Sequence, residues 1–422
     1  MHDRLSRRKF LGAVGLGAVG ATAGCAVEPP SARTIPRIDE AGIPPATIAE
    51  TQFRGGLRRR GVLPDATIPE TPAVEWTIRD VNTGDHTAAK ASPVETPGGD
   101  VVVPGDTGEV RRVTPGGEVV WTASVEETGR GIHGTPAIAN GVVYVGAYDG
   151  ALYAFDLDTG DRFWRRKLGD AIGSSPGYHD GTVYIAVEYY EPSGAMFGVD
   201  AVTGAVTWED RRPTNHPHST CAIDREAGRL VVGANDGILY AWTYPDLEFA
   251  WEFPTDGAIK GPIATDGESA VFGSWDETVY RVGLAEGTEE WAFETDDMVM
   301  SGPSIETATE TVYVGSHDTH LYALEAGSGD ERWRFDTRGR LIGCPTVTSE
   351  HVLIGSYDAH CYAVEKATGE ETWRVEGVGL VTGTPLVADG AVYFTDRASS
   401  DYLQEGDGET GGLYKVVAAD GG

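Results

Sequence analysis

The sequence predicts an all-β protein built as an eight-bladed β-propeller, because two landmarks each repeat eight times. A tryptophan recurs at intervals of 40 to 45 residues, at Trp76, Trp121, Trp164, Trp208, Trp251, Trp291, Trp333 and Trp373. A proline recurs at intervals of 40 to 45 residues as well, at Pro93, Pro136, Pro176, Pro217, Pro262, Pro303, Pro345 and Pro385. A period of this length with four short strands per unit is typical of propeller blades.

The unit from Pro136 to Trp164 shows how the four strands of a blade follow one another. Residues 136–139 form a short inner strand, and Asn140-Gly141 supplies the positive φ of a tight hairpin turn. The second strand spans 142–146 and the third spans 152–156, with Asp149-Gly150 between them. Thr159-Gly160 leads into the fourth strand around Trp164. Apolar runs without strict alternation predict blades packed on both faces.

The two ends of the chain predict how the ring closes. The eighth unit starts at Pro385 and stops after the turn at Asp420-Gly421, where a fourth strand is still missing. Trp76 is a fourth-strand tryptophan with no first three strands before it. Residues 74–80 are therefore expected to complete the last blade, which removes free strand edges. The predicted propeller domain is 72–422.

The first 25 residues have the pattern of an export and lipidation signal. Their basic stretch, SRRKFL, contains Arg7 and Arg8, and the apolar stretch 12–24 is too short to span a bilayer. The residues from Thr22 to Cys25 resemble a lipobox, which predicts that Cys25 is the lipidated first residue of the mature protein. The sequence thus predicts an exported protein held by a lipid at the outer face of the cell membrane.

Residues 26–71 are rich in proline, alanine, threonine and arginine and show no sustained periodicity, so they are predicted to form a tether. Within this stretch, Arg58, Arg59 and Arg60 either contact anionic headgroups or belong to a segment packed on the propeller.

Charge excludes one class of partner. The chain has 65 acidic and 33 basic side chains and a net charge of −32. No basic footprint for nucleic acid is visible. An acidic chain with twin-arginine and lipobox signals resembles secreted lipoproteins of halophilic archaea. Beyond Cys25, three cysteines remain without CxxC spacing, and we expect buried free thiols.

The repeat itself resembles that of quinoprotein propellers, roughly Leu-Tyr-Ala-x-Asp-x-x-Thr-Gly-x-x-x-Trp, as in residues 152–164. Residues 52–61 resemble the FRG…R…G element that often precedes such propellers. A glycine lies four residues before most of the tryptophans, although Leu247 stands in that place in the fourth unit. The resemblance implies that all eight tryptophans are structural, each docking on the neighbouring blade near that glycine.

This resemblance leaves two functions open. Quinone-dependent dehydrogenases of the family hold pyrroloquinoline quinone and Ca²⁺ on the ring axis, whereas propellers of the BamB type are non-catalytic and bind partners. The dehydrogenases have an adjacent cysteine pair and a recognisable set of Ca²⁺ ligands, and neither is found in this sequence. We therefore predict a non-catalytic binding or scaffold protein without a cofactor, with a quinoprotein alcohol or sugar dehydrogenase as the alternative. A structural spacer in an envelope complex is a third possibility.

Polar and aromatic residues that should converge on the channel are the candidate contacts for a protein partner or a small ligand. They lie in segments that lead into the inner strands and in turns between second and third strands: His133, His216, His218, Lys260, Trp275, His317 and Tyr357. Water could equally satisfy these groups. Two histidines around Pro217 lack a third ligand, so no metal site is predicted. The acidic insertion 397–411 lacks the spacing of a Ca²⁺ loop.

Overall fold

The structure is a computed structural model of the 422-residue chain, and it describes residues 51–83, 90–126, 129–398 and 410–419. The predicted export signal, Cys25, residues 26–50 of the predicted tether and most of the 397–411 insertion lie outside these ranges. No helix in the described part of the chain is long and apolar enough to cross a bilayer.

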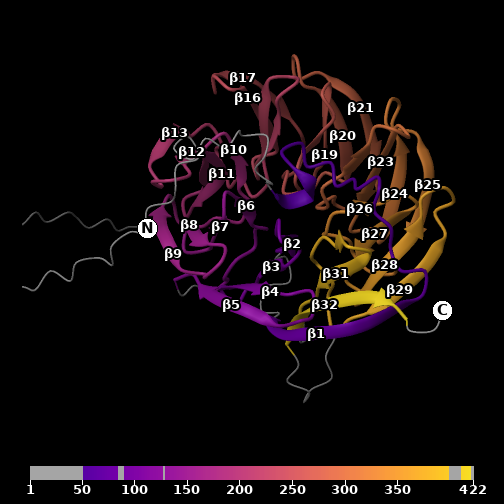
Figure 1. Ribbon diagram of the computed structural model, residues 1–422. Helices are drawn as coiled ribbons and strands as arrows, with labels where there is room; N and C mark the ends of the chain where they lie inside the picture. The colour runs from indigo at the N-terminus through magenta and orange to yellow at the C-terminus, as the bar shows by residue number, and fades with distance from the viewer. Residues whose placement is uncertain (1–50, 84–89, 127–128, 399–409, 420–422) are drawn as a thin grey trace, which may run out of the picture. The chain divides into compact units, whose positions relative to one another are not determined.

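Eight four-stranded antiparallel sheets surround a central channel, which confirms the predicted eight-bladed propeller (Figure 1). From the channel outward, the strands of blades 1 to 4 are β2 (Val94–Glu95), β3 (Val101–Pro104), β4 (Glu109–Val113) and β5 (Val119–Ser124); β6 (Ala137–Ala139), β7 (Val142–Gly146), β8 (Ala151–Asp156) and β9 (Arg162–Lys167); β10 (Gly177–His179), β11 (Thr182–Tyr189), β12 (Ser193–Asp200) and β13 (Val206–Asp210); and β14 (Ala222–Asp224), β15 (Arg229–Gly233), β16 (Ile238–Thr243) and β17 (Phe249–Pro254). The strands of blades 5 to 8 are β18 (Ala264–Thr265), β19 (Ser269–Gly273), β20 (Thr278–Gly283) and β21 (Glu289–Glu294); β22 (Ser304–Glu306), β23 (Thr311–Gly315), β24 (His320–Glu325) and β25 (Glu331–Asp336); β26 (Thr346–Val347), β27 (His351–Gly355), β28 (His360–Glu365) and β29 (Glu371–Glu376); and β30 (Leu386–Ala388), β31 (Ala391–Thr395), β32 (Gly411–Ala418) and β1 (Pro72–Asn82).

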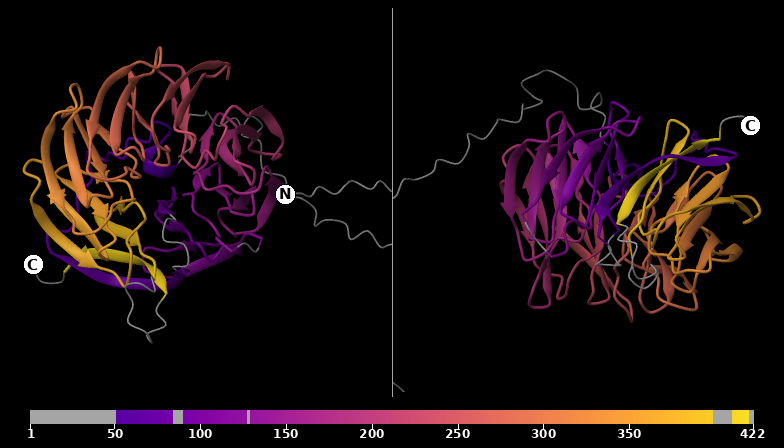
Figure 2. Two further views of the ribbon diagram at one scale, coloured as in Figure 1. Left: turned by 180° about the vertical axis from the view of Figure 1, so that it is seen from behind. Right: turned by 90° about the horizontal axis from the view of Figure 1, so that it is seen from below.

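Blade 8 joins the two ends of the ring, as the sequence predicts. Its outer strand β1 pairs antiparallel with β32 from Pro72 opposite Ala418 to Asn82 opposite Gly411, and Trp76 lies opposite Lys415. Figure 2 shows β1 beside the yellow β32 from two further sides. The closing strand is longer than the predicted 74–80 at both ends.

The hydrophobic core lies between neighbouring blades rather than inside one. One cluster combines Tyr144 and Leu152 of blade 2 with Ile185 and Phe197 of blade 3. Inner and middle strands are buried almost throughout, whereas outer strands such as β5 alternate between buried and exposed residues. A single blade therefore has no core of its own, and stacking around the ring supplies one.

Seven of the eight repeat tryptophans donate their indole N–H to a backbone carbonyl. In six of them this carbonyl belongs to the next blade around the ring. Trp121 donates to the Leu157 carbonyl at 2.8 Å, and Gly160 adopts φ +74° beneath its ring. A Cβ at Gly160 would lie 2.8 Å from the indole, so only glycine permits this approach. Trp373 has no following turn of this kind and donates instead to the Pro69 carbonyl at 2.8 Å.

Blade 4 departs from this arrangement at the position that the sequence marks. Leu247 replaces the glycine and adopts φ +57°. Trp208 packs edge to face on Trp242, with ring centroids 5.7 Å apart. Trp242 is fully buried and donates its indole N–H to Asp210 at 2.8 Å.

The proline landmark needs a correction in blade 4. The Thr135 N–H donates to Ser175 Oγ in the next blade at 2.9 Å, and the Ser175 N–H donates in the same way to Thr220 Oγ1 at 3.0 Å. Cys221, which follows Thr220, therefore holds the place that proline has elsewhere. Pro217 lies four residues earlier and fitted the period by chance. Cys221, Cys344 and Cys361 are buried free thiols, as predicted.

The tether prediction is wrong for residues 51–71, because this stretch packs on the ring. We call residues 51–69 the plug. It includes a 3-10 helix, η2 (Phe53–Gly55), and contacts the turns between first and second strands, so that side of the ring is the plug face. Successive turns of an antiparallel sheet lie at opposite ends, so the turns between second and third strands define the other side, the turn face.

Candidate functional site

The predicted site residues lie around the channel on the turn face and form three contact groups. The first spans blades 2 and 3, where the Tyr148 ring lies 6.4 Å from the His218 ring. The His133 ring lies 4.1 Å from the Tyr148 ring, and His218 Nδ1 lies 2.8 Å from Glu188 Oε1. His216 Nε2 lies 2.8 Å from the Tyr189 carbonyl. These contacts hold both histidines of the His-Pro-His stretch against the hairpin between β11 and β12.

Charge around Glu188 is balanced by these histidines. Burial alone would raise the pKa of the Glu188 carboxyl, but the charge and hydrogen bond of His218, with the charge of His216, outweigh burial and lower it. The carboxylate thus serves as an acceptor at neutral pH. No cluster of three His, Cys, Asp or Glu side chains that could hold a metal occurs among the described residues.

The second group contains Lys260 and Trp275. The Lys260 ammonium lies 3.6 Å from the centroid of the Trp275 ring, a cation–π contact. Lys90 Nζ donates to the Lys260 carbonyl at 3.0 Å from inside the channel. Burial lowers the pKa of Lys260, and Glu188 partly offsets this.

The third group contains His317 and Tyr357, whose rings lie 6.5 Å apart. Burial lowers the pKa of His317 to about 4, with Asp297 opposing and Arg340 and Lys90 adding to the effect. His317 is therefore neutral at physiological pH. The three groups place aromatic and cationic side chains around one opening, but the structure does not join them into a single constellation.

Lys90 gives a stability test of the channel. Burial lowers its pKa from 10.5 to about 8, with Cys344 opposing and Lys260 adding to the shift. We expect Lys90→Met to raise the free energy of unfolding at pH 7 by roughly 2 kcal/mol, since the desolvation penalty outweighs the lost bond to Lys260. Between pH 8 and 10.5 the unfolded chain holds a proton that the folded chain has released. Wild-type stability should therefore rise with pH there, and the advantage of the variant should shrink. Urea titrations at a series of pH values check this, and a constant difference would contradict it.

Sequence reasoning missed an exposed aromatic residue beside the first group. Tyr190, at the tip of the β11–β12 hairpin, is 85% exposed. Its backbone N–H donates to Asp170 at 2.9 Å, and the neighbouring Tyr189 ring carries the Arg211 guanidinium 5.0 Å above it. The adjacent pair Tyr189-Tyr190, in the connection between β11 and β12, was the sequence feature that could have indicated this exposed residue.

Sequence reasoning left the packing of residues 52–61 open, and it did not foresee that this stretch closes the channel from the other side. Arg59 is 1% exposed and donates to the carbonyls of Phe53 at 2.9 Å, Pro176 at 3.1 Å and Cys221 at 3.2 Å. Arg58 pairs with Asp224 at 3.1 Å and Glu226 at 2.7 Å. The alternative in which this stretch packs on the propeller is therefore the one that the structure supports.

Beneath Phe53 of the plug, the residues on the ring axis leave too little space for a quinone cofactor. Phe53 covers a pocket of about 10 Å³, lined by Lys90, His133, Ser175, His218, Thr220 and Cys344 among others. This volume holds about one water molecule. Neither the pocket nor the donor set of the described residues fits pyrroloquinoline quinone with Ca²⁺, which needs six or more oxygen ligands.

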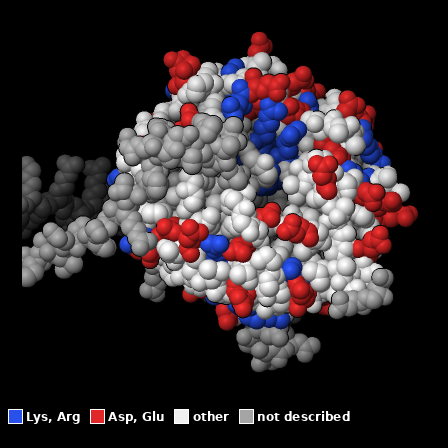
Figure 3. Space-filling view, viewed as in Figure 1, with Lys and Arg blue, Asp and Glu red and all other residues white. Residues whose placement is uncertain are grey.

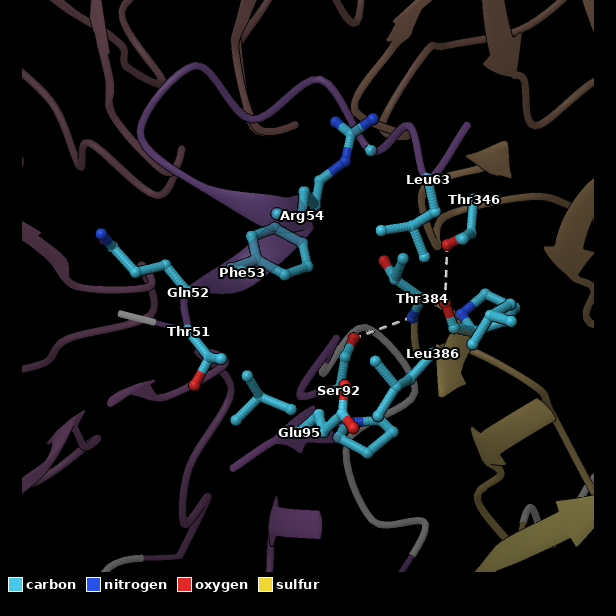
Figure 4. A pocket seen from close by; sticks show the side chains of 16 residues that line it. Thr51, Gln52, Phe53, Arg54, Leu63, Ser92, Glu95, Thr346, Thr384 and Leu386 are labelled. Atoms are coloured by element: carbon cyan, nitrogen blue, oxygen red, sulfur yellow. Dashed lines mark hydrogen bonds between the residues drawn. The ribbon is translucent and has the colours of Figure 1, made fainter. Parts of the chain in front are cut away.

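Two of the surface hollows on the plug face border the plug itself. One, of about 570 Å³, is bordered by Arg58, Arg60, Arg225 and His179, and Figure 3 shows basic side chains gathered beside the centre of this otherwise mixed face. The other, of about 180 Å³, lies between the plug and the inner strands of blades 8 and 1 (Figure 4).

These features define a propeller of quinoprotein-type repeats whose channel is closed at one end by its own chain. The model of a family described as outer membrane protein assembly factor BamB matches residues 106–225, 221–334 and 317–421. The chain belongs to this family.

Curated relatives include both kinds of protein that the repeat suggests. Outer membrane protein assembly factor BamB of Escherichia coli (strain K12) is 30% identical over 195 residues, 44% of this chain and 47% of the relative. A quinohemoprotein alcohol dehydrogenase of Comamonas testosteroni is 30% identical over 179 residues, 37% of this chain and 25% of the relative. The matching segment thus spans less than half the length of either relative.

Solved structures agree in fold. A europium-containing methanol dehydrogenase superposes with a TM-score of 0.72 at 12% identity, covering 86% of this chain and 97% of that one. BamB from Moraxella catarrhalis superposes with a TM-score of 0.60 at 15% identity, covering 83% and 99%. At these identities the likeness establishes the propeller fold alone.

Proposed function

We propose that this protein is a non-catalytic propeller that binds a protein partner through its turn face, and that a lipid on Cys25 holds it at the outer face of the cell membrane. The main observation in favour of partner binding is the exposure of Tyr190. An 85% exposed tyrosine on a hairpin braced by Asp170 and His216 is a rigid aromatic anchor of the kind enriched in protein interfaces.

The surroundings of Tyr190 support the same use. Arg211 and the aromatic ring of Tyr189 lie at its base, while Trp275 and Tyr357 belong to the same set of turns around the channel. Arginine, tyrosine and tryptophan dominate the binding energy of measured interfaces. The membership in the BamB family supports a binding role as well. The membrane location rests on the Arg7-Arg8 motif and the lipobox.

Tyr190→Ala is expected to reduce partner retention at least tenfold without changing stability, because the side chain touches little of the fold. A photo-crosslinking residue in place of Tyr190 should yield a discrete crosslinked product from the full chain in intact cells. The same residue at Val206, exposed on the outer strand of the same blade, is the matched control. Equal products at both positions, or none at Tyr190, would count against the turn face.

The dehydrogenase alternative is tested on the same preparation. We add pyrroloquinoline quinone and Ca²⁺ at high salt and follow quinone binding and alcohol-dependent dye reduction. The small pocket beneath Phe53 and the side chains that line it predict neither quinone binding nor dye reduction. Tight quinone binding with turnover would overturn the non-catalytic proposal.

A further inference from the structure

The inner strand of each blade turns one edge toward the channel, and the plug pairs with that edge on six consecutive blades. Blade by blade from 2 to 7, the backbone N–H of the second inner-strand residue donates to a plug oxygen: Ile138 to Thr51 O at 2.8 Å, Tyr178 to Gln52 Oε1 at 2.8 Å, Ile223 to Leu57 O at 3.0 Å, Thr265 to Arg58 O at 2.9 Å, Ile305 to Arg60 O at 3.1 Å and Val347 to Gly61 O at 2.8 Å. The accepting plug residues are one or two positions apart at 51–52 and again from 57 to 61, where the plug pairs with blades 4 to 7 through its backbone carbonyls.

Blades 8 and 1 present the same edge without this pairing. Val387 lies opposite Val392 in β30–β31, and Glu95 lies opposite Val101 in β2–β3, as Ile138 lies opposite Val143 in blade 2. The equivalent register directs the N–H of Val387 and of Glu95 toward the channel. No residue in the described part of the chain accepts a hydrogen bond from either of them.

The two edges flank the 180 Å³ hollow, where the plug leaves the channel after Leu63. Figure 4 shows Leu63, Leu386 and Phe53 around this hollow, with Glu95 at its margin. Thr346 donates to the Pro385 carbonyl at 2.6 Å, and the Thr384 N–H donates to Ser92 Oγ at 2.8 Å, so its walls are fixed. A largely apolar hollow beside unpaired strand edges is suited to an extended peptide.

We propose that this hollow binds an extended segment of a partner protein, which adds to the inner strands of blades 8 and 1 as the plug adds to the other six. Two backbone carbonyls of this segment, one or two residues apart, accept hydrogen bonds from the backbone N–H groups of Val387 and Glu95. An uncharged apolar side chain of the segment enters between Leu63 and Leu386. The site lies on the plug face and does not depend on the function proposed for the turn face.

Glu95 restricts the occupant. Its carboxyl lies at the margin of the hollow, where burial and then the charge of Asp389 raise its pKa. An acidic side chain at this point would add a third negative charge, so an acidic segment is disfavoured and a basic or neutral one is accepted.

The test uses a probe taken from the protein itself. The pentapeptide copying Arg60 to Pro64, capped at both ends and labelled with fluorescein, contains the Gly61 carbonyl and the Leu63 amide that pair with Val347 in blade 7. We expect saturable binding to the full chain by fluorescence anisotropy. Hydrogen exchange resolved to single amides should slow at Val387 and Glu95.

Val387→Pro removes the channel-facing N–H and leaves the ladder to β31 intact, since proline is tolerated on an outer edge. It should weaken the probe about five- to tenfold, the effect of one lost hydrogen bond. Val387→Ala is the matched control, which loses the same side chain but keeps the N–H, and it should stay within threefold. Thermal melts verify that both variants fold.

Three results would overturn the proposal. The probe could fail to saturate up to 1 mM, or it could bind Val387→Pro as tightly as Val387→Ala. The amides of Val387 and Glu95 could also exchange as slowly as that of Ile138 in the protein alone. In that last case the chain itself would occupy the hollow.

Discussion

Asp106→Asn is expected to lower the free energy of unfolding by about 3 to 5 kcal/mol, because it leaves a buried guanidinium without its counter-charge. Arg397 Nη1 lies 2.7 Å from Asp106 Oδ2, and the two side chains are 1% and 2% exposed. Burial lowers the pKa of Arg397, and the charge and hydrogen bond of Asp106 oppose this. The pair joins blade 8 to blade 1, so its loss weakens the closure of the ring.

The pair is embedded in a network, which makes truncation costly. Arg397 also donates to Thr382 Oγ1 at 3.0 Å and to Asn82 Oδ1 at 3.3 Å, and the Thr83 N–H donates to the second Asp106 oxygen at 2.6 Å. Asparagine keeps the shape of the aspartate side chain. The change in unfolding free energy of Asp106→Asn therefore reports the lost charge and not a cavity.

Equilibrium urea titration at constant salt measures the loss. Glu325→Gln is the control, because it removes a carboxylate from the exposed pair with Arg332, and such pairs contribute less than about 1 kcal/mol. A double change of Asp106→Leu with Arg397→Met should recover much of the loss, because no unpaired charge remains. Equal losses for Asp106→Asn and Glu325→Gln would show that the buried pair does not stabilise the closure.

The repeated part of the fold follows from the sequence because every blade repeats the same local chemistry. A fourth-strand tryptophan, a turn glycine and an Asn-Gly or Asp-Gly hairpin are local signals, and each occurs many times. Even the closing strand could be predicted, since Trp76 stands in register without the strands that should precede it. Leu247 marked the blade in which the tryptophan docks differently.

The pairing of the plug with the blades could not be predicted, because its hydrogen bonds follow the ring and not a single neighbouring strand. The plug oxygens that accept from the inner strands each serve a different blade. The plug sequence therefore has no period of two and resembles a tether. Thr51 and Gly61 pair with residues 87 and 286 positions later in the chain, at Ile138 and Val347. Such contacts have no local signature.

The location of the candidate site residues around the channel was predicted, but the contacts between their side chains were not. His218 was expected near the channel, yet its partner Glu188 belongs to the hairpin of the previous blade. Lys260 and Trp275 both belong to blade 5 and were chosen for separate reasons, while the structure places one over the other. Periodicity assigns a residue to a turn or a strand. It does not specify which side chain of the neighbouring blade lies opposite.

Arg59→Ala is expected to lower the free energy of unfolding by about 3 to 4 kcal/mol, whereas Arg60→Ala in the same Arg-Arg-Arg stretch should cost less than about 0.5 kcal/mol. Arg59 is buried, and burial lowers its pKa to about 10, with Cys221 opposing and Arg54 adding to the shift. It nevertheless remains charged at neutral pH and donates to three carbonyls that no other described donor satisfies. Without it, blades 3 and 4 lose the guanidinium that links the carbonyls of Pro176 and Cys221 to that of Phe53 in η2.

Hydrogen exchange separates the loss of the plug from unfolding of the ring. In Arg59→Ala the amides of Ile223, Thr265 and Ile305, which donate to the plug, should exchange faster than in the wild type. Amides between the second and third strands of the same blades should keep their protection, because stacking of the blades does not need the plug. If Arg59→Ala and Arg60→Ala lose equal stability, or if both sets of amides are exposed together, the plug is not a separate structural unit. If both sets of amides are exposed together, this propeller folds only around residues 51–69.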